Sequence, residues 1–367
     1  MDRHIENQAS TMKWTNDITR LLGIDFPIVQ APMFGVTTPE MVAAAGTAGC
    51  LGSLALADLH ADQCRDAIHK TRMLTQRPFA VNLFVHHIPA IDDRLRTDYA
   101  EATAWMEQLA QRYNLAVKLP AIDDLAMHNY AEQIEAIMDE NCKIVSFTFG
   151  NLDPQSIARL KSKGTVLIGT CTSVKEAELL AQADIDIICV QGIEAGGHRG
   201  TFATEDIPAI GGLSLLAQVS EAVQVPLLYA GGIYNAKTLL AARALGANGF
   251  QIGSLLLGSA ESALHDFEKD RSRRAKESDI VLTKSFSGRF ARGIKNIFVD
   301  ESEASGLILP YPYQNKLTAE LRKVARSNKL SEFVNIWMGQ SISEFSGDST
   351  TSIIKRLIEQ TEVLAGL

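Results

Sequence analysis

The chain has 367 residues, of which 46% are hydrophobic and 21% are charged, and its formal net charge is −8. This composition is typical of a globular protein with a sizeable core and excludes a disordered chain. The modest acidic balance, without a basic run or an aromatic and basic stripe, argues against a nucleic-acid partner.

The N-terminal segment and the apolar runs predict neither secretion nor a membrane span. The opening MDRHIENQASTMKW carries acidic residues and no apolar stretch, so we expect no signal or transit peptide. The longest apolar runs, such as Pro226–Ile233, are far shorter than the roughly 18 residues that a membrane helix needs. The 5 cysteines are widely spaced, which favours buried free thiols and no metal site. The sequence therefore predicts a cytoplasmic protein without a membrane partner.

Eight short apolar runs, rich in β-branched residues, alternate with helical patterns along the chain. Nearly continuous apolar runs are typical of strands that are buried on both faces of a parallel sheet. The predicted strands are Pro27–Met33, Leu51–Leu56, Phe79–Val85, Lys143–Phe149, Thr165–Cys171, Ile185–Gln191, Val225–Ile233 and Gly249–Leu256.

Helices with recognisable N-terminal signals lie between these strands. The helix predicted over Thr38–Ala48 opens on a threonine cap and the one over Asn235–Leu245 on an asparagine cap. In the helix over Ser173–Ala183, Glu176 follows the serine cap at the spacing of a capping box.

The regular alternation predicts a (β/α)8 TIM barrel rather than a doubly wound open sheet, because no G-x-G-x-x-G fingerprint is present. Two long excursions interrupt it, and we expect several helices in the first, His86–Asn141. We place the barrel at residues 1–263, closed by a C-terminal helix at 346–367. A smaller, mainly helical substrate-capping subdomain is expected at 264–345, after the eighth strand.

Glycines stand where the last two strands end, a pair in the first case and one in the second, at the place where barrels usually hold phosphate. The sequences are Ala230-Gly231-Gly232-Ile233 and Gln251-Ile252-Gly253-Ser254. Paired glycines let backbone N–H groups approach an anion, and the helix that follows points its positive end the same way. The alternative is that these glycines only allow tight turns.

The loop after the sixth strand, QGIEAGGHRG, carries the single imidazole of His198 at the mouth of the predicted barrel. Imidazole is suited to act as a general base near neutral pH. The rival pair His86-His87 follows the third strand, and the remaining histidines lie away from strand ends. Glu194 in the same loop either takes part in catalysis or ties the loop to a neighbouring element.

Asn82 and Gln191 are polar side chains inside apolar strands, and buried amides need hydrogen-bond partners. Either they brace the barrel interior, or they bind a heterocycle with both donors and acceptors. Isoalloxazine is such a ring, and with a neighbouring phosphate it describes FMN.

Taken together, several segments resemble the nitronate monooxygenase family, formerly called 2-nitropropane dioxygenases, and its class I branch in particular. The resemblance extends from about residue 24 to residue 340. It rests on QGIEAGGHRG, APMFGVTTPEMVAAAGTAGCLGSLAL, VNLF, YAGGIYNAKTLLAARALGANGFQIGS, PYPYQNKLT and WMGQ.

The resemblance implies an FMN-dependent barrel that oxidises alkyl nitronates with O2 to a carbonyl compound and nitrite, with His198 as the base that deprotonates neutral nitroalkanes. The FMN contacts it implies are Pro32, Met33, Asn82, Gln191, Gly196, Gly197, Gly231, Gly232, Gln251, Ile252, Gly253 and Ser254. Substrate-pocket candidates from the capping segment, which could equally pack only among themselves, are Tyr311, Tyr313, Lys316, Trp337 and Gln340.

Two other functions stay open at this point. One is an FMN-dependent NAD(P)H:quinone or enoyl-acyl-carrier-protein reductase on the same barrel. The other is a flavin-free, phosphate-binding barrel such as an aldolase or an isomerase. The sequence leaves open whether the protein is a monomer or a homodimer.

Overall fold

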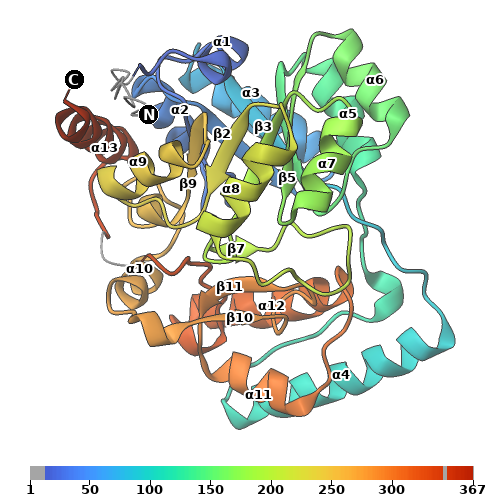
Figure 1. Ribbon diagram of the computed structural model, residues 1–367. Coiled ribbons are helices and arrows are strands. Elements are labelled where there is room, and N and C mark those ends of the chain that lie inside the picture. Colours follow the sequence, from blue (N-terminus) through green and yellow to red (C-terminus); the bar gives the residue numbers. More distant parts are fainter. Residues whose placement is uncertain (1–12, 342–344, 367) are drawn as a thin grey trace, which may run out of the picture.

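The computed structural model describes residues 13–341 and 345–366 and confirms the predicted TIM barrel. In these residues, eight parallel strands form one sheet in the order β1-β9-β8-β6-β5-β4-β3-β2 (Figure 1). A parallel bridge between Val29 and Leu51 joins the two end strands and closes the sheet on itself. The strands are β1 (Ile28–Gln30), β2 (Gly52–Ala57), β3 (Phe79–Phe84), β4 (Ile144–Thr148), β5 (Val166–Cys171), β6 (Ile187–Gln191), β8 (Leu227–Ala230) and β9 (Gly249–Ile252).

Every one of these strands falls inside or within one residue of a predicted run, because a strand in a closed barrel is buried on both faces. Side chains such as Ala80 and Cys189 fill the barrel interior, together with Ile18 and Leu22 from helix α1 (Asp17–Leu22). A larger cluster lies between the strands and the surrounding helices. Helix α1 therefore plugs the amino-terminal end of the barrel and leaves the carboxyl end for a site.

The barrel helices begin where the local signals predict. Thr38 and Asn235 cap α2 and α9 by accepting the backbone N–H groups of Met41 and Thr238. The helices around the barrel are α2 (Pro39–Thr47), α3 (Ala61–Leu74), α5 (Tyr130–Asp139), α6 (Pro154–Ser162), α7 (Val174–Gln182), α8 (Gly212–Ala222) and α9 (Ala236–Ala244).

Helix α7 departs from its predicted capping box. Ser173 does accept the N–H of Glu176 at 3.2 Å, but the Glu176 carboxylate does not return to Ser173. It is fully buried and instead accepts N–H groups from Thr172 (2.6 Å), Phe202 (2.5 Å) and Ala203 (3.0 Å). Glu176 thus accepts N–H groups that are distant in sequence and does not complete the capping box with Ser173. These bonds anchor α7 to the segment after His198.

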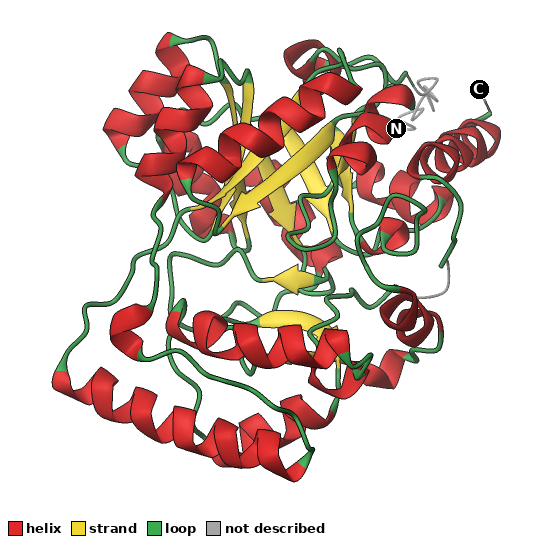
Figure 2. Cartoon of the chain, turned by 180° about the vertical axis from the view of Figure 1, so that it is seen from behind, coloured by secondary structure: helices red, strands yellow, loops and turns green. Residues whose placement is uncertain are grey.

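A second layer covers the carboxyl end of the barrel (Figure 2). It contains a three-stranded antiparallel sheet of β10 (Ile280–Thr283), β11 (Ala291–Ile294) and β7 (Gly197–His198), so it is less purely helical than predicted. Its helices are α4 (Asp93–Arg112), α10 (Asp266–Arg273), α11 (Ile297–Ser305) and α12 (Tyr313–Ser327).

Helix α4 belongs to the hydrophobic cluster of this layer, although the sequence placed it with the barrel. Its buried stripe includes Tyr99 and Met106, and Trp105 packs on Phe298 at 6.3 Å between ring centroids. Figure 1 shows α4 along the outer edge of the layer, beside α11. The capping layer is therefore built from two separate stretches of chain, because the α4 stripe finds its apolar partner in the excursion after β9.

The C-terminal helix α13 (Thr350–Ala365) packs against the barrel side, as expected of a closing helix. Its Thr351 hydroxyl donates to the carbonyl of Ala44 in α2 at 2.7 Å. The last residue of the predicted 346–367 segment lies outside the described residues. Within the described residues, no helix combines the length and the apolarity that crossing a membrane requires.

Candidate active site

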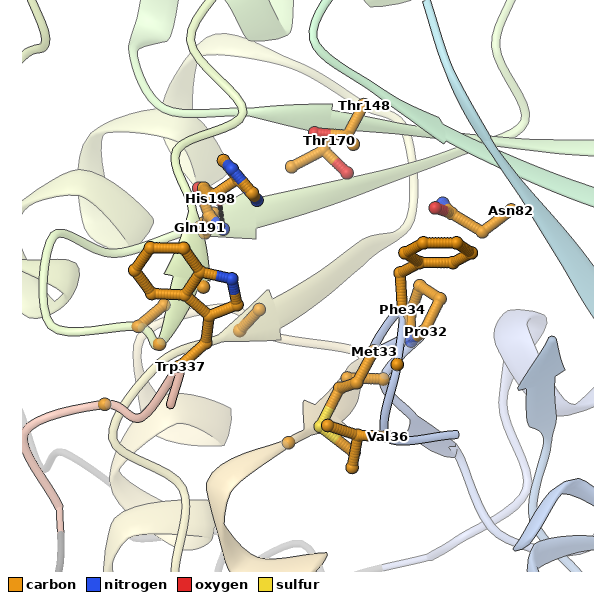
Figure 3. Close-up of a pocket in the computed structure, with 18 of the residues that line it drawn as sticks. Pro32, Met33, Phe34, Val36, Asn82, Thr148, Thr170, Gln191, His198 and Trp337 are labelled. Atoms are coloured by element: carbon orange, nitrogen blue, oxygen red, sulfur yellow. Dashed lines mark hydrogen bonds between the residues drawn. The ribbon is translucent and has the colours of Figure 1, made fainter. Parts of the chain in front are cut away.

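A cavity of about 500 Å3 lies at the carboxyl ends of the strands, where barrel enzymes carry their sites. In Figure 3, Gln191, His198 and Trp337 form one wall and the loop after β1 forms the facing wall. The predicted residues that line it are Pro32, Met33, Asn82, Gln191, Gly196, Gly197, His198, Gly231, Gly232, Gln251, Gly253, Ser254, Tyr311, Lys316 and Trp337.

Three predicted site residues, all in the described part of the chain, do not line this cavity. Ile252 follows Gln251 in β9 and so points to the opposite face of the strand, into the cluster beneath the helices. Tyr313 is buried in the capping layer, where its hydroxyl donates to the carbonyl of Pro89 at 2.6 Å. Gln340 is exposed and uses its backbone N–H to bind the carbonyl of Glu194.

The loop that carries His198 is held by the side chain of Gln191. The Gln191 amide donates to the carbonyl of His198 at 3.0 Å and accepts the N–H of Gly200 at 2.9 Å. These two bonds hold the carboxyl end of the short strand β7 and the residues that follow it. Gln191 thus braces the loop while it lines the cavity, and Asn82, which also lines the cavity, donates to the hydroxyl of Ser146 at 2.9 Å.

Arginines bind the carbonyl groups of the same loop. Arg199, which is buried, donates to the carbonyls of Gly192 (2.7 Å) and Gln191 (2.9 Å). Arg292 in β11 donates to the carbonyl of Ile193 at 2.9 Å. Burial lowers the pKa of Arg199 to about 10, so its guanidinium still carries a charge at neutral pH. Charge-assisted bonds of this kind are stronger than neutral ones and hold the loop in one conformation.

Glu194 ties the loop to its neighbours, as one of its two interpretations proposed. Its carboxylate accepts the hydroxyl of Tyr229 and, at 3.0 Å, the N–H of Gly212 at the start of α8. Burial and the neighbouring carboxylate raise the pKa of Tyr229, which therefore keeps its proton. With both oxygens engaged, Glu194 is a structural anchor of the loop.

The imidazole of His198 lies among aromatic rings in the wall of the cavity. The ring centroids of Trp337 and Phe149 are 5.3 Å and 5.5 Å away, and Tyr311 completes the enclosure at 6.4 Å. Burial first, and then the charges of Arg289 and Arg322, lower the pKa of His198 to about 3. The imidazole is therefore neutral at physiological pH, with a lone pair free to accept a proton.

The cationic side chains that line the cavity differ in whether their charge is paired. Lys316 is paired with Asp58, with 2.5 Å between Nζ and Oδ2, and so adds no net positive charge. Arg322, one turn and a half further along α12, lines the cavity and donates to neutral groups, namely Asn315 and Thr318. Burial lowers its pKa to about 10, which leaves it charged. Arg322 is therefore a cation in the cavity lining whose charge an anion in the cavity would feel.

Backbone N–H groups point to an anion site on the barrel side of the cavity. Within the described residues, the N–H groups of Gly231, Gly232 and Gly253 have no hydrogen-bond partner. Gly231 and Gly232 have φ angles of 133° and 66°, which side chains rarely allow. Unpaired N–H groups beside glycines form the kind of concave cradle that binds a phosphate.

Several cavity residues escaped sequence analysis. Thr148 and Thr170 are polar residues within predicted apolar strands, the same signal that revealed Asn82. Asn315, Arg322 and Asn335 had no such signal, because charged and polar residues are ordinary on an amphipathic helix and its flanks. The rival His86 packs on Tyr311 at 4.7 Å, behind the cavity wall. The described residues hold no cluster of three or more side chains suited to a metal ion.

The model of one protein family, described as nitronate monooxygenase, matches residues 15–360. The chain belongs to the nitronate monooxygenase family. A probable nitronate monooxygenase of Staphylococcus aureus (strain Newman) is 36% identical over 348 residues, which is 94% of this chain and 97% of that protein.

Solved structures agree with this assignment. The nitroalkane oxidase of Streptomyces ansochromogenes is 33% identical, superposes with a TM-score of 0.84 and covers 95% of this chain and 98% of its own. FabK of Thermotoga maritima is 25% identical, with a TM-score of 0.71 and coverages of 96% and 97%. Membership of the nitronate monooxygenase family makes this protein an oxidoreductase that acts on nitro compounds, and it supports a flavin cofactor.

Proposed function

We propose that the protein uses FMN and O2 to oxidise alkyl nitronates to a carbonyl compound and nitrite, and that His198 first deprotonates neutral nitroalkanes. The observation that carries the proposal is a neutral imidazole, enclosed by aromatic rings, in a cavity that also offers unpaired N–H groups. A proton acceptor and an anion cradle in one cavity suit this reaction.

The residues present fit FMN. The N–H groups of Gly231, Gly232 and Gly253 would hold its phosphate. Asn82, Pro32 and Met33 face the volume that a planar ring would fill. When bound, FMN would accept electrons from the nitronate, and O2 would complete the oxidation.

The protein's own contribution is to move a proton and to stabilise an anion. His198 would take the proton from the carbon that bears the nitro group, which gives an imidazolium beside a nitronate. Burial disfavours an isolated imidazolium, so the adjacent anion is what makes the proton transfer favourable. The charge of Arg322 stabilises the same anion, and Trp337 and Phe149 keep water away from the pair.

Two measurements on the purified protein test the reaction. Released cofactor is identified as FMN or another flavin by chromatography, and turnover of ethyl nitronate is followed by oxygen uptake and nitrite formation together. We expect FMN and nitrite formation that tracks oxygen uptake. Flavin reduction by NADH alone under anaerobic conditions would favour the reductase alternative, and a protein that stays colourless after addition of FMN would favour a flavin-free barrel.

His198→Asn tests the base. We expect this variant to retain FMN and to lose turnover of neutral nitroalkanes, while it largely preserves turnover of preformed nitronates, which have no proton to remove. An equal loss with both substrates would show that His198 is not simply a base.

A further inference from the structure

The Nε2 edge of the His198 imidazole contacts a serine of the capping layer. Nε2 lies 2.8 Å from Oγ of Ser287, in the connection between β10 and β11. Ser287 is 1% exposed. The α12 residue Thr318 donates to the carbonyl of the preceding Phe286 at 2.6 Å, so the connection is fixed in place.

The hydrogen bonds of Ser287 determine where the imidazole proton lies. A hydroxyl has one proton to donate and can accept two hydrogen bonds. Oγ is 3.0 Å from the carbonyl oxygen of Arg289, which can only accept, and 3.3 Å from the Arg289 N–H, which can only donate. All three contacts of Oγ are satisfied only when Nε2 of His198 carries its proton and donates it to Ser287.

We propose that Ser287 is a positioning residue that holds neutral His198 as the Nε2–H tautomer and leaves the Nδ1 lone pair as the proton acceptor. Within the described residues, Nδ1 has no hydrogen-bond partner, and the ring lines the cavity. In the opposite tautomer, the Ser287 hydroxyl would have to donate its proton to Nε2. The Arg289 carbonyl would then lose the hydrogen bond that it accepts from Ser287. The bond also selects one ring orientation, because a flipped ring would present a carbon to Oγ.

The tautomer is a property of the protein itself, and only the role of Nδ1 rests on the proposed function. The first experiment is nitrogen NMR of the flavin-loaded enzyme with 15N-labelled histidine, with His198 assigned by the signal lost in His198→Asn. We expect a protonated Nε2 and a bare Nδ1 at neutral pH. A protonated Nδ1 would overturn the inference, whatever the enzyme oxidises.

Ser287→Ala connects the tautomer to the reaction. We expect the single tautomer to give way to a mixture, and kcat/KM for neutral nitroalkanes to fall roughly 10- to 100-fold. Turnover of preformed nitronates should change by less than about twofold, because it needs no proton transfer to His198. A parallel loss with both substrates, or an unchanged tautomer, would assign Ser287 a structural role only.

Ser285→Ala is the matched control. Ser285 is buried two residues away and bonds to Thr283 (2.7 Å) and to the carbonyl of Val299 (3.4 Å), without a contact to His198. It should lower stability yet leave both the tautomer and the ratio of the two activities unchanged. If no nitro compound is oxidised by the parent enzyme, the proposed function fails, and the NMR result still decides the tautomer.

Discussion

Replacement of Glu176 by glutamine is predicted to destabilise the fold strongly although it keeps the shape of the side chain. The carboxylate accepts from Thr172 on one side and from the N–H groups of Phe202 and Ala203 on the other. An amide offers one oxygen and one NH2 group. If the oxygen stays with Phe202 and Ala203, the NH2 group faces Thr172, whose hydroxyl can accept but whose backbone N–H loses its acceptor. A buried donor without an acceptor costs roughly 1–3 kcal/mol.

Such a loss is large beside a typical unfolding free energy of about 5–15 kcal/mol. We expect the urea midpoint, followed by tryptophan fluorescence at one saturating FMN concentration, to fall with an unchanged slope. Glu178→Gln is the matched control, because Glu178 is exposed on the same helix and should change stability by no more than about 0.5 kcal/mol. A Glu176→Gln protein as stable as the parent would refute the assignment of Glu176 as the buried acceptor.

Three further outcomes are expected. Because burial holds the pKa of His198 near 3, a plot of kcat/KM for neutral nitroalkanes against pH should show no acid limb near pH 6.5. An acid limb there would contradict a neutral base. The contribution of the neutral ring to folding stability is present above about pH 6.5 and is lost as pH falls toward 3. Arg322→Gln should raise KM for nitronates roughly 5- to 10-fold, whereas Lys323→Gln, exposed on the same helix, should leave it unchanged. Gly231→Ala should weaken FMN binding measured by fluorescence titration, whereas Gly164→Ala, also left-handed but facing open space, should cost only about 1–3 kcal/mol of stability.

Local chemistry explains what could be predicted from the sequence. Strands buried on both faces appear as apolar runs, and the caps at Thr38 and Asn235 act within one helical turn, so both can be recognised without knowledge of the fold. His198 stood out because a single imidazole among glycines follows a strand, and the structure places it in the cavity wall.

Long-range pairing explains what could not be predicted. The pattern of α4 shows an apolar stripe but not its partner, which is the cluster around Phe298. The sequence could not show that Lys316 is paired, because its partner Asp58 lies far away along the chain. Glu176 carried the correct capping spacing and still served a distant loop, because buried N–H groups there needed an acceptor.

The pairing of β7 with β11 places His198 mechanically in the capping layer, although β7 lies between two barrel strands in the sequence. The bonds of Gln191 in β6 hold the same loop to the barrel, so the imidazole lies where the two layers are joined. The height of the proton acceptor above the cradle is set by how the two layers sit on each other. Helix α4 packs against α12, which carries Arg322, so this packing is one of the contacts that fix that height.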